Sequence, residues 1–386
     1  MALLDRIEWG VLAFTTPDGV TRRFGSGNPA SGVARAAELH LRDWSVCRSV
    51  LVGGDVAFAE SYMDARWDTT DLAALLTLMA CNQRALEHAF YGRRWRQVVM
   101  RLRHLLRPNS KRRAPRNVAA HYDLGNEFYD LWLDPTMTYS AALFDGDMTC
   151  QLAAAQQAKY ARVLRQIAPP QNAQLLELGC GWGGFAETAA RAGCRVNGVS
   201  LSRAQTAYAR DRVAGAGYAD RVNLRLQDYR DATGRYDGVA SIEMFEAVGE
   251  RYWPAFFRAV RRALKPGARA CIQTITIADE RFPKYRQSSD FIQQYIFPGG
   301  MLPSPSRFIE EANRAGLQVE DVHRFGQDYA ETLKRWLSAF DANVDAVRSQ
   351  GFDDRFIRCW RFYLAYCVAG FTSKTTDVAQ YTLSAR

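Results

Sequence analysis

The sequence predicts an α/β fold, in which a doubly wound parallel sheet follows a smaller N-terminal α+β domain. From about residue 170 onward, short apolar segments alternate with segments of helical character. A glycine-rich turn joins the first of these strands to the first helix. Residues 5–91 instead mix strand and helix signals. Strands that are separated by helices pair in parallel, because each helix returns the chain to the same end of the sheet.

The elements of the larger domain follow one another in a regular order. Strands are expected at residues 174–178, 195–199, 222–226, 236–242 and 270–277. Helices are expected at residues 184–191, at residues 203–214 and directly before Pro266-Gly267. Proline lacks a backbone N–H and clashes with the preceding turn, so the last of these helices should end there.

The N-terminal domain is expected to begin with a β-hairpin. Residues 10–14 and 22–24 are predicted strands, and Pro-Asp-Gly at residues 17–19 lies between them. Glycine accepts the positive φ that tight hairpin turns require. A helix is predicted from residue 71 to about residue 90, with one of the two preceding threonines as its N-cap.

The composition is that of a globular intracellular protein. Of the 386 residues, 48% are hydrophobic and 24% are charged, which favours two folded domains over disorder. The apolar runs are short and broken by charges, and charged residues at positions 5, 6 and 8 argue against a secretory signal. The eight cysteines form no CxxC pair, so we expect no metal site and a reducing cytoplasm.

One segment accounts for the net charge of +9. Residues 93–116 hold 10 Lys and Arg residues and no acid, and residues 94–107 have helical periodicity. This helix either docks on the next domain or lies on anionic lipid. No nucleic-acid module accompanies it. The predicted organisation is therefore an N-terminal lipid-interacting domain (1–107), a basic linker (108–118) and a larger domain (119–386).

The glycine-rich turn is the strongest functional signal. Gly179, Gly181 and Gly183 follow the first strand at GxGxG spacing, and Glu177 stands two residues before them. Glycine lets the backbone approach a ligand, and the helix start offers free N–H groups. The alternative is a tight packing turn without a ligand. The spacing resembles the S-adenosylmethionine motif of class I methyltransferases and differs from the dinucleotide motif GxGxxG.

Two later stretches would complete a cofactor site. Many methyltransferases of this kind place an acid after the second strand to hold the ribose hydroxyls. Residues 199–205 contain no carboxylate, so Ser200 and Gln205 are the candidate substitutes. After the third strand, Asp228 could accept a hydrogen bond from the adenine amino group, although it could also be an ordinary helix cap.

Further stretches resemble the cyclopropane-fatty-acyl-phospholipid synthase family. They are residues 120–140, Glu-Met-Phe-Glu-Ala-Val-Gly at 243–249, residues 291–300 and residues 360–371. The likeness covers about residues 115–375. It implies a class I methyltransferase fold, acyl-binding insertions and a methyl transfer from S-adenosylmethionine to a cis double bond, with S-adenosylhomocysteine as product. It also implies cofactor contacts from Tyr139, Ser140, Tyr229 and Ile242.

In that family a carbocation follows methyl transfer, and a bound bicarbonate removes a proton from it. The resemblance assigns bicarbonate ligands to Glu246, Ile275 and Tyr329. Two positions depart from the family pattern, because Ala141 replaces a cysteine and Gln273 replaces a histidine. Neither alanine nor a neutral glutamine supplies the lost side-chain donors and charge. Aromatic faces can stabilise a cation, and Tyr295, Phe297, Tyr363 and Tyr366 are candidates.

These departures favour a methyl-branched unsaturated acyl product. Cyclopropane formation on the same substrate, methyl transfer to a small amine, and lipid binding without catalysis are the alternatives. The expected partner is a phospholipid bilayer with unsaturated chains and anionic headgroups, and no nucleic acid. The protein is expected to be cytoplasmic, peripheral at the inner membrane surface and, by family precedent, a homodimer.

Overall fold

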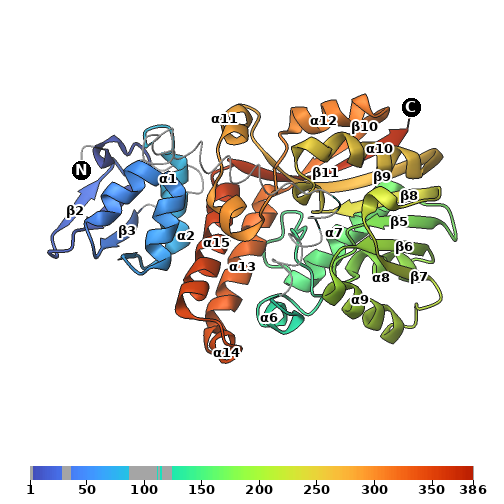
Figure 1. The fold of residues 1–386 in the computed structure, drawn as a ribbon, viewed down its shortest axis with the longest axis horizontal. Helices are drawn as coiled ribbons and strands as arrows, with labels where there is room; N and C mark the ends of the chain where they lie inside the picture. Colours follow the sequence, from blue (N-terminus) through green and yellow to red (C-terminus); the bar gives the residue numbers. More distant parts are fainter. Residues whose placement is uncertain (1–2, 28–35, 87–110, 112–113, 115–123, 386) are drawn as a thin grey trace. The chain divides into compact units, whose positions relative to one another are not determined.

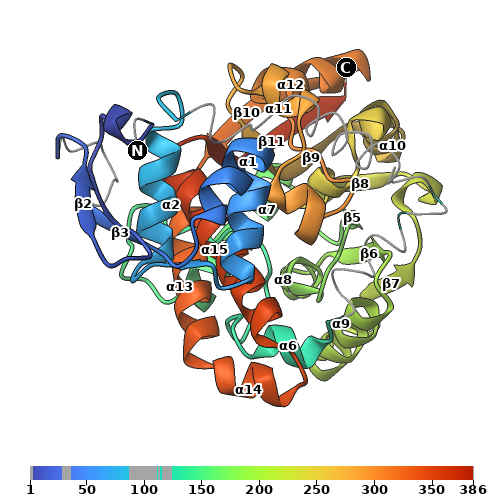
Figure 2. The ribbon, with the colours of Figure 1, turned by 60° about the vertical axis from the view of Figure 1, so that its left-hand side comes forward.

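The computed structural model describes residues 3–27, 36–86, 111, 114 and 124–385 and divides the chain into two compact units. Unit 1 consists of Met1–Leu106, Pro283–Pro298 and Ala330–Thr376, and unit 2 consists of Arg107–Phe282, Gly299–Tyr329 and Asp377–Arg386. The chain therefore passes between the units several times. Figure 1 and Figure 2 show the elements of both units along the chain.

Unit 2 contains a seven-stranded sheet in the order β10-β11-β9-β8-β5-β6-β7. Its central strands are β5 (Gln174–Leu178), β6 (Arg195–Ser200), β7 (Val222–Leu226), β8 (Tyr236–Ile242) and β9 (Leu264–Ile277). All pairings among these five strands are parallel, and their positions confirm the predicted strand order. β9 begins earlier than predicted, because a register shift opposite β8 accommodates the Pro266-Gly267 sequence within the strand.

Two further strands were not predicted. β10 (Leu317–Arg324) and β11 (Thr376–Ala385) pair antiparallel and extend the sheet beyond β9. β11 is buried over most of its length although its residues are largely small or polar. Its strand character therefore comes from packing within the sheet and not from an apolar run.

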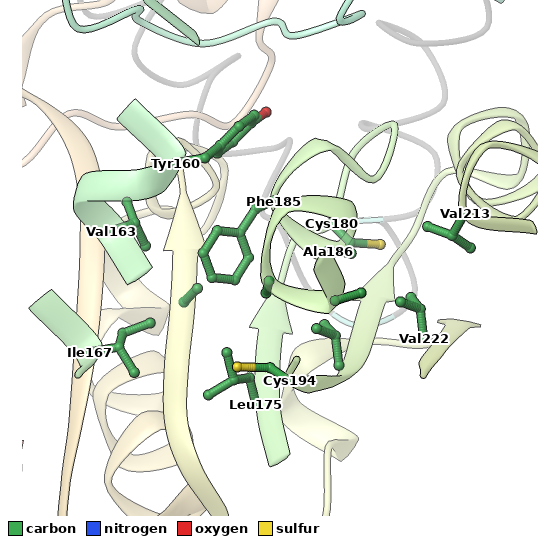
Figure 3. Packing of buried hydrophobic residues seen from close by; sticks show 14 of the residues in the cluster. Tyr160, Val163, Ile167, Leu175, Cys180, Phe185, Ala186, Cys194, Val213 and Val222 are labelled. Atoms are coloured by element: carbon green, nitrogen blue, oxygen red, sulfur yellow. The ribbon is translucent and has the colours of Figure 1, made fainter. Parts of the chain in front are cut away.

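Helices cover both faces of this sheet, as in a doubly wound fold. The helices are α7 (Leu152–Ile167), α8 (Gly184–Arg191), α9 (Arg203–Gly215), α10 (Trp253–Ala263) and α12 (Pro305–Arg314). α8 and α9 lie on one face, and α10 and α12 lie on the other (Figure 1). Figure 3 shows Val163 and Ile167 of α7 packed with Leu175 and Phe185 in one buried cluster. This cluster packs the start of α8 against the sheet.

The remaining elements of the unit are short. They are α6 (Asn126–Asp130), η2 (Tyr229–Asp231), η3 (Phe245–Ala247), η4 (Glu250–Tyr252) and the first turn of α13 (Gly326–Ala342). η3 directly follows the end of β8 and contains Glu246. It therefore places that carboxylate at the end of the sheet where ligands bind in open α/β folds.

Unit 1 has a four-stranded sheet in the order β2-β1-β3-β4. Its elements are η1 (Leu4–Arg6), β1 (Val11–Thr15), β2 (Thr21–Phe24), β3 (Ala36–Leu41), α1 (Ser45–Met63), β4 (Trp67–Asp68), α2 (Leu72–Cys81), α11 (Phe282–Gln287), η5 (Ile292–Ile296), α14 (Val344–Ser349), α15 (Asp354–Thr372) and the rest of α13. β1 and β2 are antiparallel, which confirms the predicted hairpin.

The predicted helix at residues 71–90 is corrected in two respects. α2 is shorter than predicted, because it ends at Cys81 and turns follow up to residue 86. Its N-cap is Asp71 and neither of the preceding threonines, since the Asp71 carboxylate accepts a hydrogen bond from the backbone N–H of Ala74 at 2.8 Å. Asp ranks above Thr as an N-cap, which explains the difference.

Arg358 of α15 joins that helix to α1 and β4 within unit 1. Its guanidinium donates to the backbone oxygens of Tyr62 at 2.5 Å and Trp67 at 3.0 Å. The guanidinium carbon also lies 3.8 Å from the centroid of the Tyr62 ring. The side chain is 17% exposed, so these interactions are largely shielded from water.

We expect Arg358→Ala to lower the free energy of unfolding by about 2–4 kcal/mol, because it leaves two carbonyl oxygens without their charged donor. Chemical denaturation would measure this. The matched control is Arg361→Ala on the same helix, which removes an ion pair with Asp341 at 2.5 Å whose members are 31% and 45% exposed. This control should change stability by less than about 1 kcal/mol. Equal effects of the two substitutions would contradict the prediction.

The basic helix predicted at residues 94–107 lies outside the described residues. So does the linker 108–118 except for Lys111 and Ala114, which belong to unit 2. The lipid-interacting role of the N-terminal domain and its boundary at residue 107 stay predictions. Within the described part of the chain, none of the helices combines the length and apolar character that a transmembrane span requires.

Candidate active site

The glycine turn after β5 packs closely against neighbouring side chains. Gly179 has φ 81°, and a Cβ built there would lie 2.7 and 2.8 Å from the Cγ and Cβ of Met244. At Gly184, the first residue of α8, a Cβ would lie 2.6 Å from the Tyr160 hydroxyl. Glycine is therefore required at both positions, for conformation at the first and for space at both.

A pocket opens beside this turn at the carboxyl ends of β5, β6 and β8. The pocket is lined by all ten residues that the sequence predicts for the cofactor: Tyr139, Ser140, Glu177, Gly179, Gly181, Ser200, Gln205, Asp228, Tyr229 and Ile242. Residues that sequence reasoning left out also line it, among them Met137, Thr138, Trp182, Arg230, Glu243 and Met244. The structure thus gathers the predicted residues in one place, while the role of each stays a prediction.

Glu177 supplies a buried acceptor to this pocket. The residue is 3% exposed, and its Oε2 has no hydrogen-bond partner among the described residues. Burial raises the pKa of Glu177 well above its ordinary value, and the charges of Lys159 and Arg212 oppose the rise. A buried acceptor without a donor suits a ligand that carries positive charge and N–H or O–H groups.

Asp228 lies in the pocket but is already engaged. It accepts hydrogen bonds from the backbone N–H of Arg230 at 2.9 Å and from the guanidinium at 2.8 and 2.5 Å. Ser200 accepts from the backbone N–H of Ser202 at 3.2 Å, and Ser202 in turn caps α9. An adenine amino group would therefore share the Asp228 carboxylate with Arg230.

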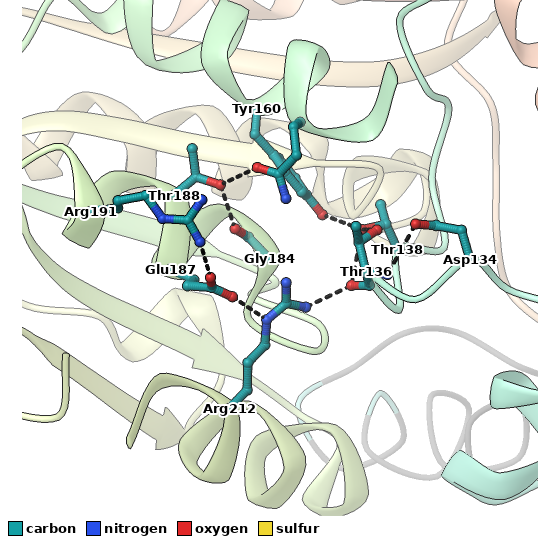
Figure 4. A network of polar contacts seen from close by, with 10 residues as sticks. Asp134, Thr136, Thr138, Tyr160, Gly184, Glu187, Thr188, Arg191 and Arg212 are labelled. Carbon is teal, nitrogen blue, oxygen red and sulfur yellow. Dashed lines mark hydrogen bonds and ion pairs between the residues drawn. The ribbon is translucent and has the colours of Figure 1, made fainter. Parts of the chain in front are cut away.

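A polar network links the segment Asp134–Thr138 to neighbouring helices, as Figure 4 shows. The Thr138 hydroxyl lies 3.1 Å from the Tyr160 hydroxyl and 2.8 Å from that of Thr136. Arg212 of α9 donates to the backbone oxygen of Thr136 and to Glu187 of α8, both at 2.6 Å. The segment around Met137–Ser140 is thereby tied to α7, α8 and α9, which also position the glycine turn.

One of the five predicted catalytic residues, Glu246, lies beside a second glutamate, Glu243, and the other four donate to this pair. Three donors converge on Glu243: the backbone N–H of Ala141 at 2.8 Å, the amide of Gln273 at 2.7 Å and the hydroxyl of Tyr329 at 2.7 Å. Glu246 accepts from the backbone N–H of Ile275 at 2.5 Å and from the hydroxyl of Thr274 at 3.0 Å.

The two carboxylates share a buried, charged cluster with Lys159. Burial raises the pKa of both glutamates, and the charge of Glu243 adds to the rise at Glu246, which reaches about 8. Burial lowers the pKa of Lys159 to about 7, and Glu243 is the first of the carboxylates that oppose the shift. Two close carboxylates hold one proton between them. Because Glu243 accepts from three donors and the charge of Lys159 favours its ionised form, we assign the proton to Glu246.

Sequence reasoning missed the roles of Glu243 and Lys159. Lys159 is fully buried on α7, and its Nζ lies 2.5 Å from the hydroxyl of Ser140. Its sequence signal is a lysine on the apolar face that also carries Ala155, Val163 and Ile167. Glu243 lies one residue beyond β8 and has φ 51°, a conformation that glutamate rarely adopts and that no sequence pattern reveals.

The four aromatic candidates for cation stabilisation belong to unit 1 and do not line this pocket. The rings of Phe297 and Tyr363 meet edge to face at 6.3 Å. The hydroxyl of Tyr295 donates to Glu60 at 2.7 Å, and that of Tyr366 donates to Asp55 at 3.2 Å. Their predicted catalytic role stays a prediction.

Comparison with known families decides the class of this site. The model of the mycolic acid cyclopropane synthetase family matches residues 109–381. The chain belongs to this family. Membership confirms the predicted resemblance, the class I methyltransferase fold, an enzyme and S-adenosylmethionine as its cofactor. The pocket beside the glycine turn, with Glu177 in its lining, fits a sulfonium donor that also carries an ammonium and ribose hydroxyls.

The similarity to individual relatives of this cyclopropane synthetase family member extends over most of the chain. It is 40% identical over 380 residues to a tuberculostearic acid methyltransferase of Mycobacterium tuberculosis, covering 93% of this chain and 86% of the relative. It is 33% identical over 352 residues to the cyclopropane-fatty-acyl-phospholipid synthase of Escherichia coli, covering 90% and 88%. A mycolic acid cyclopropane synthase solved with SAH and CTAB superposes with a TM-score of 0.65 at 31% identity, covering 70% of this chain and 97% of that chain.

Proposed function

We propose that this family member transfers a methyl group from S-adenosylmethionine to a cis double bond of a phospholipid-bound acyl chain and releases a methyl-branched unsaturated product. The name of the Escherichia coli relative supports a phospholipid acyl chain as substrate. The name of the Mycobacterium tuberculosis relative, a methyltransferase, supports a product without a ring. Anionic headgroups, peripheral membrane binding and a homodimer are part of the proposal.

One observation carries the proposal about the product. Ala141 has no side-chain donor, and the amide of Gln273 is committed to Glu243. The amide has a defined orientation, because its oxygen accepts from Gln380 at 3.0 Å and the Gln380 oxygen accepts from Arg162 at 2.8 Å. A bicarbonate would therefore meet neither the cysteine nor the histidine that the family resemblance assigns to it. A base held in a different arrangement favours loss of a proton from a neighbouring chain carbon over loss of one from the new methyl group. The product is then a methyl-branched alkene and not a cyclopropane.

When bound, S-adenosylmethionine supplies an electrophilic methyl group. The chain's own residues bind it at the glycine turn, keep water out and hold the two glutamates beside the pocket. An alkene is a weak nucleophile, so most of the rate must come from holding the alkene in line with the methyl group. The proton then lost from the acyl chain goes to a group on the wall of the pocket.

Mass spectrometry on phospholipid vesicles with cis-unsaturated chains tests this function. With a trideuteriomethyl donor, loss of a proton from a neighbouring chain carbon leaves all three deuterium atoms in the product, and ozone still cleaves its double bond. Cyclopropane formation loses one deuterium and the double bond. Methylation of a soluble amine but of no lipid would instead support the small-molecule alternative.

A further inference from the structure

We propose that the Glu243 carboxylate is the base that deprotonates the acyl carbocation, in the place that the family resemblance gives to bicarbonate. The inference rests on the proposed function. Tyr329, Gln273 and the position of Ala141, which the resemblance assigns to the bicarbonate site, all donate to Glu243. The chain thereby supplies its own anion to these donors.

The position of Glu243 suits a base. Glu243 is among the residues that line the cofactor pocket, whereas Glu246 is not among the described residues that do so. A carboxylate offers about four lone-pair positions, and the three donors occupy three of them. Among the described residues, Oε1 accepts from Ala141 and Gln273, and Oε2 accepts from Tyr329. Oε2 therefore keeps a lone pair that can take up a proton.

Burial raises the pKa of Glu243, and the surrounding groups oppose this rise by favouring its charged form. The charge of the fully buried Lys159 is the strongest influence that favours ionised Glu243. The hydrogen bonds from Tyr329, Ala141 and Gln273 also favour the ionised form. Glu246 holds the proton that two neighbouring buried carboxylates share. Its Oε1 accepts from Ile275 and Thr274, and its Oε2, without a partner among the described residues, is free to carry that proton.

Atoms and electrons balance without a further reagent. The alkene electron pair forms a bond to the methyl carbon as the bond from that carbon to sulfur breaks, which leaves S-adenosylhomocysteine and a cation at the other alkene carbon. A C–H bond on the neighbouring chain carbon then breaks. Its electron pair forms the new double bond, and the proton goes to Glu243. Ionised Glu243 is regenerated when this proton passes to water.

The backbone of Glu243 suggests a clean variant. Its φ of 51° lies in the left-handed region, which favours glycine, so Glu243→Gly removes the carboxylate and relieves strain at once. A control should relieve the same strain elsewhere. Asn172 has φ 57° in an exposed turn before β5, and Asn172→Gly should leave activity unchanged.

The test compares these proteins in buffer freed of carbon dioxide and after addition of bicarbonate or formate. The wild type should bind neither anion by calorimetry and methylate vesicles equally well in both buffers. Glu243→Gly should bind formate in the absence of any cofactor. Its activity should fall about a hundredfold or more and recover at least about tenfold with either anion, more with the more basic bicarbonate than with formate.

Several outcomes would overturn the inference. A wild type that needs bicarbonate, or a Glu243→Gly protein that stays active or is not rescued while it binds S-adenosylmethionine normally, excludes Glu243 as the base. Should the glycine variant fail to fold, Glu243→Gln replaces it, and full activity there would also exclude the role. If the wild type methylates no lipid, the proposed function fails instead, and the formate-binding comparison still reports on the anion site.

Discussion

Replacing Gly179 by alanine is expected to weaken binding of S-adenosylmethionine by about a hundredfold. Alanine at φ 81° costs about 1–2 kcal/mol in backbone energy. The new Cβ would also lie 2.8 Å from the Cβ of Met244, an atom that the backbone fixes in place and that cannot rotate away. The folded variant relieves these effects by moving the turn or Met244, which both line the pocket, and we expect the displaced turn to cost about 3 kcal/mol of binding free energy, or about two factors of ten in affinity. Calorimetric titration of the folded variant would measure the change.

Gly217→Ala is the matched control, because it separates the cost of the backbone conformation from the cost of the contact with Met244. Gly217 has nearly the same φ, 80°, but a Cβ built there meets nothing within 4 Å, and the residue does not line the pocket. Gly217→Ala should cost about 1 kcal/mol of stability and leave the affinity unchanged. An unchanged affinity in Gly179→Ala would show that the turn does not touch the cofactor.

Replacing Lys159 by methionine is expected to lower the free energy of unfolding by about 3–5 kcal/mol near neutral pH. Methionine is of similar size but removes a cation that acts on both Glu177 and Glu243, and only Glu177 keeps a second one, Arg212. The pKa values of both carboxyl groups, already raised by burial, should rise further. Denaturation curves across pH would detect both effects.

The pH dependence of this variant has a definite sign. With raised pKa values, the folded protein keeps protons that the unfolded chain has released above about pH 4.5. Stability of Lys159→Met relative to the wild type should therefore fall as pH rises from about 5 through the raised pKa values. Adding Glu243→Gln should recover part of the loss, because it removes one uncompensated charge. A variant as stable as the wild type at every pH would show that the lysine does not balance these charges.

Local patterns were sufficient for the cofactor half of the site. The Gly179 turn, the strand before it and the helix after it follow from short-range rules of apolar runs, glycine and helix starts. Strands β5, β7 and β8 have the predicted bounds. Since parallel strands end at one edge of a sheet, residues that follow successive strands, such as Ser200 and Asp228, had to converge on one pocket.

The catalytic half depended on contacts between distant segments. The sequence pointed to Glu246, and residues 141, 273 and 329 appeared to belong with it; the fold instead brings all three to Glu243. A backbone conformation such as that of Glu243 leaves no periodic trace in a sequence. Similarly, β11 forms because the sheet offers it partners, although its own residues do not form an apolar run.

By itself, then, the sequence determined the class of fold and the cofactor, and it predicted residues that the structure gathers around one pocket, because these depend on neighbours along the chain or on parallel strands in order. The tertiary structure alone decided which carboxylate those residues hold and which cation balances it. Hydrogen bonds and charges act over a few ångströms in space, and the bonded residues lie between 19 and 102 positions apart along the chain.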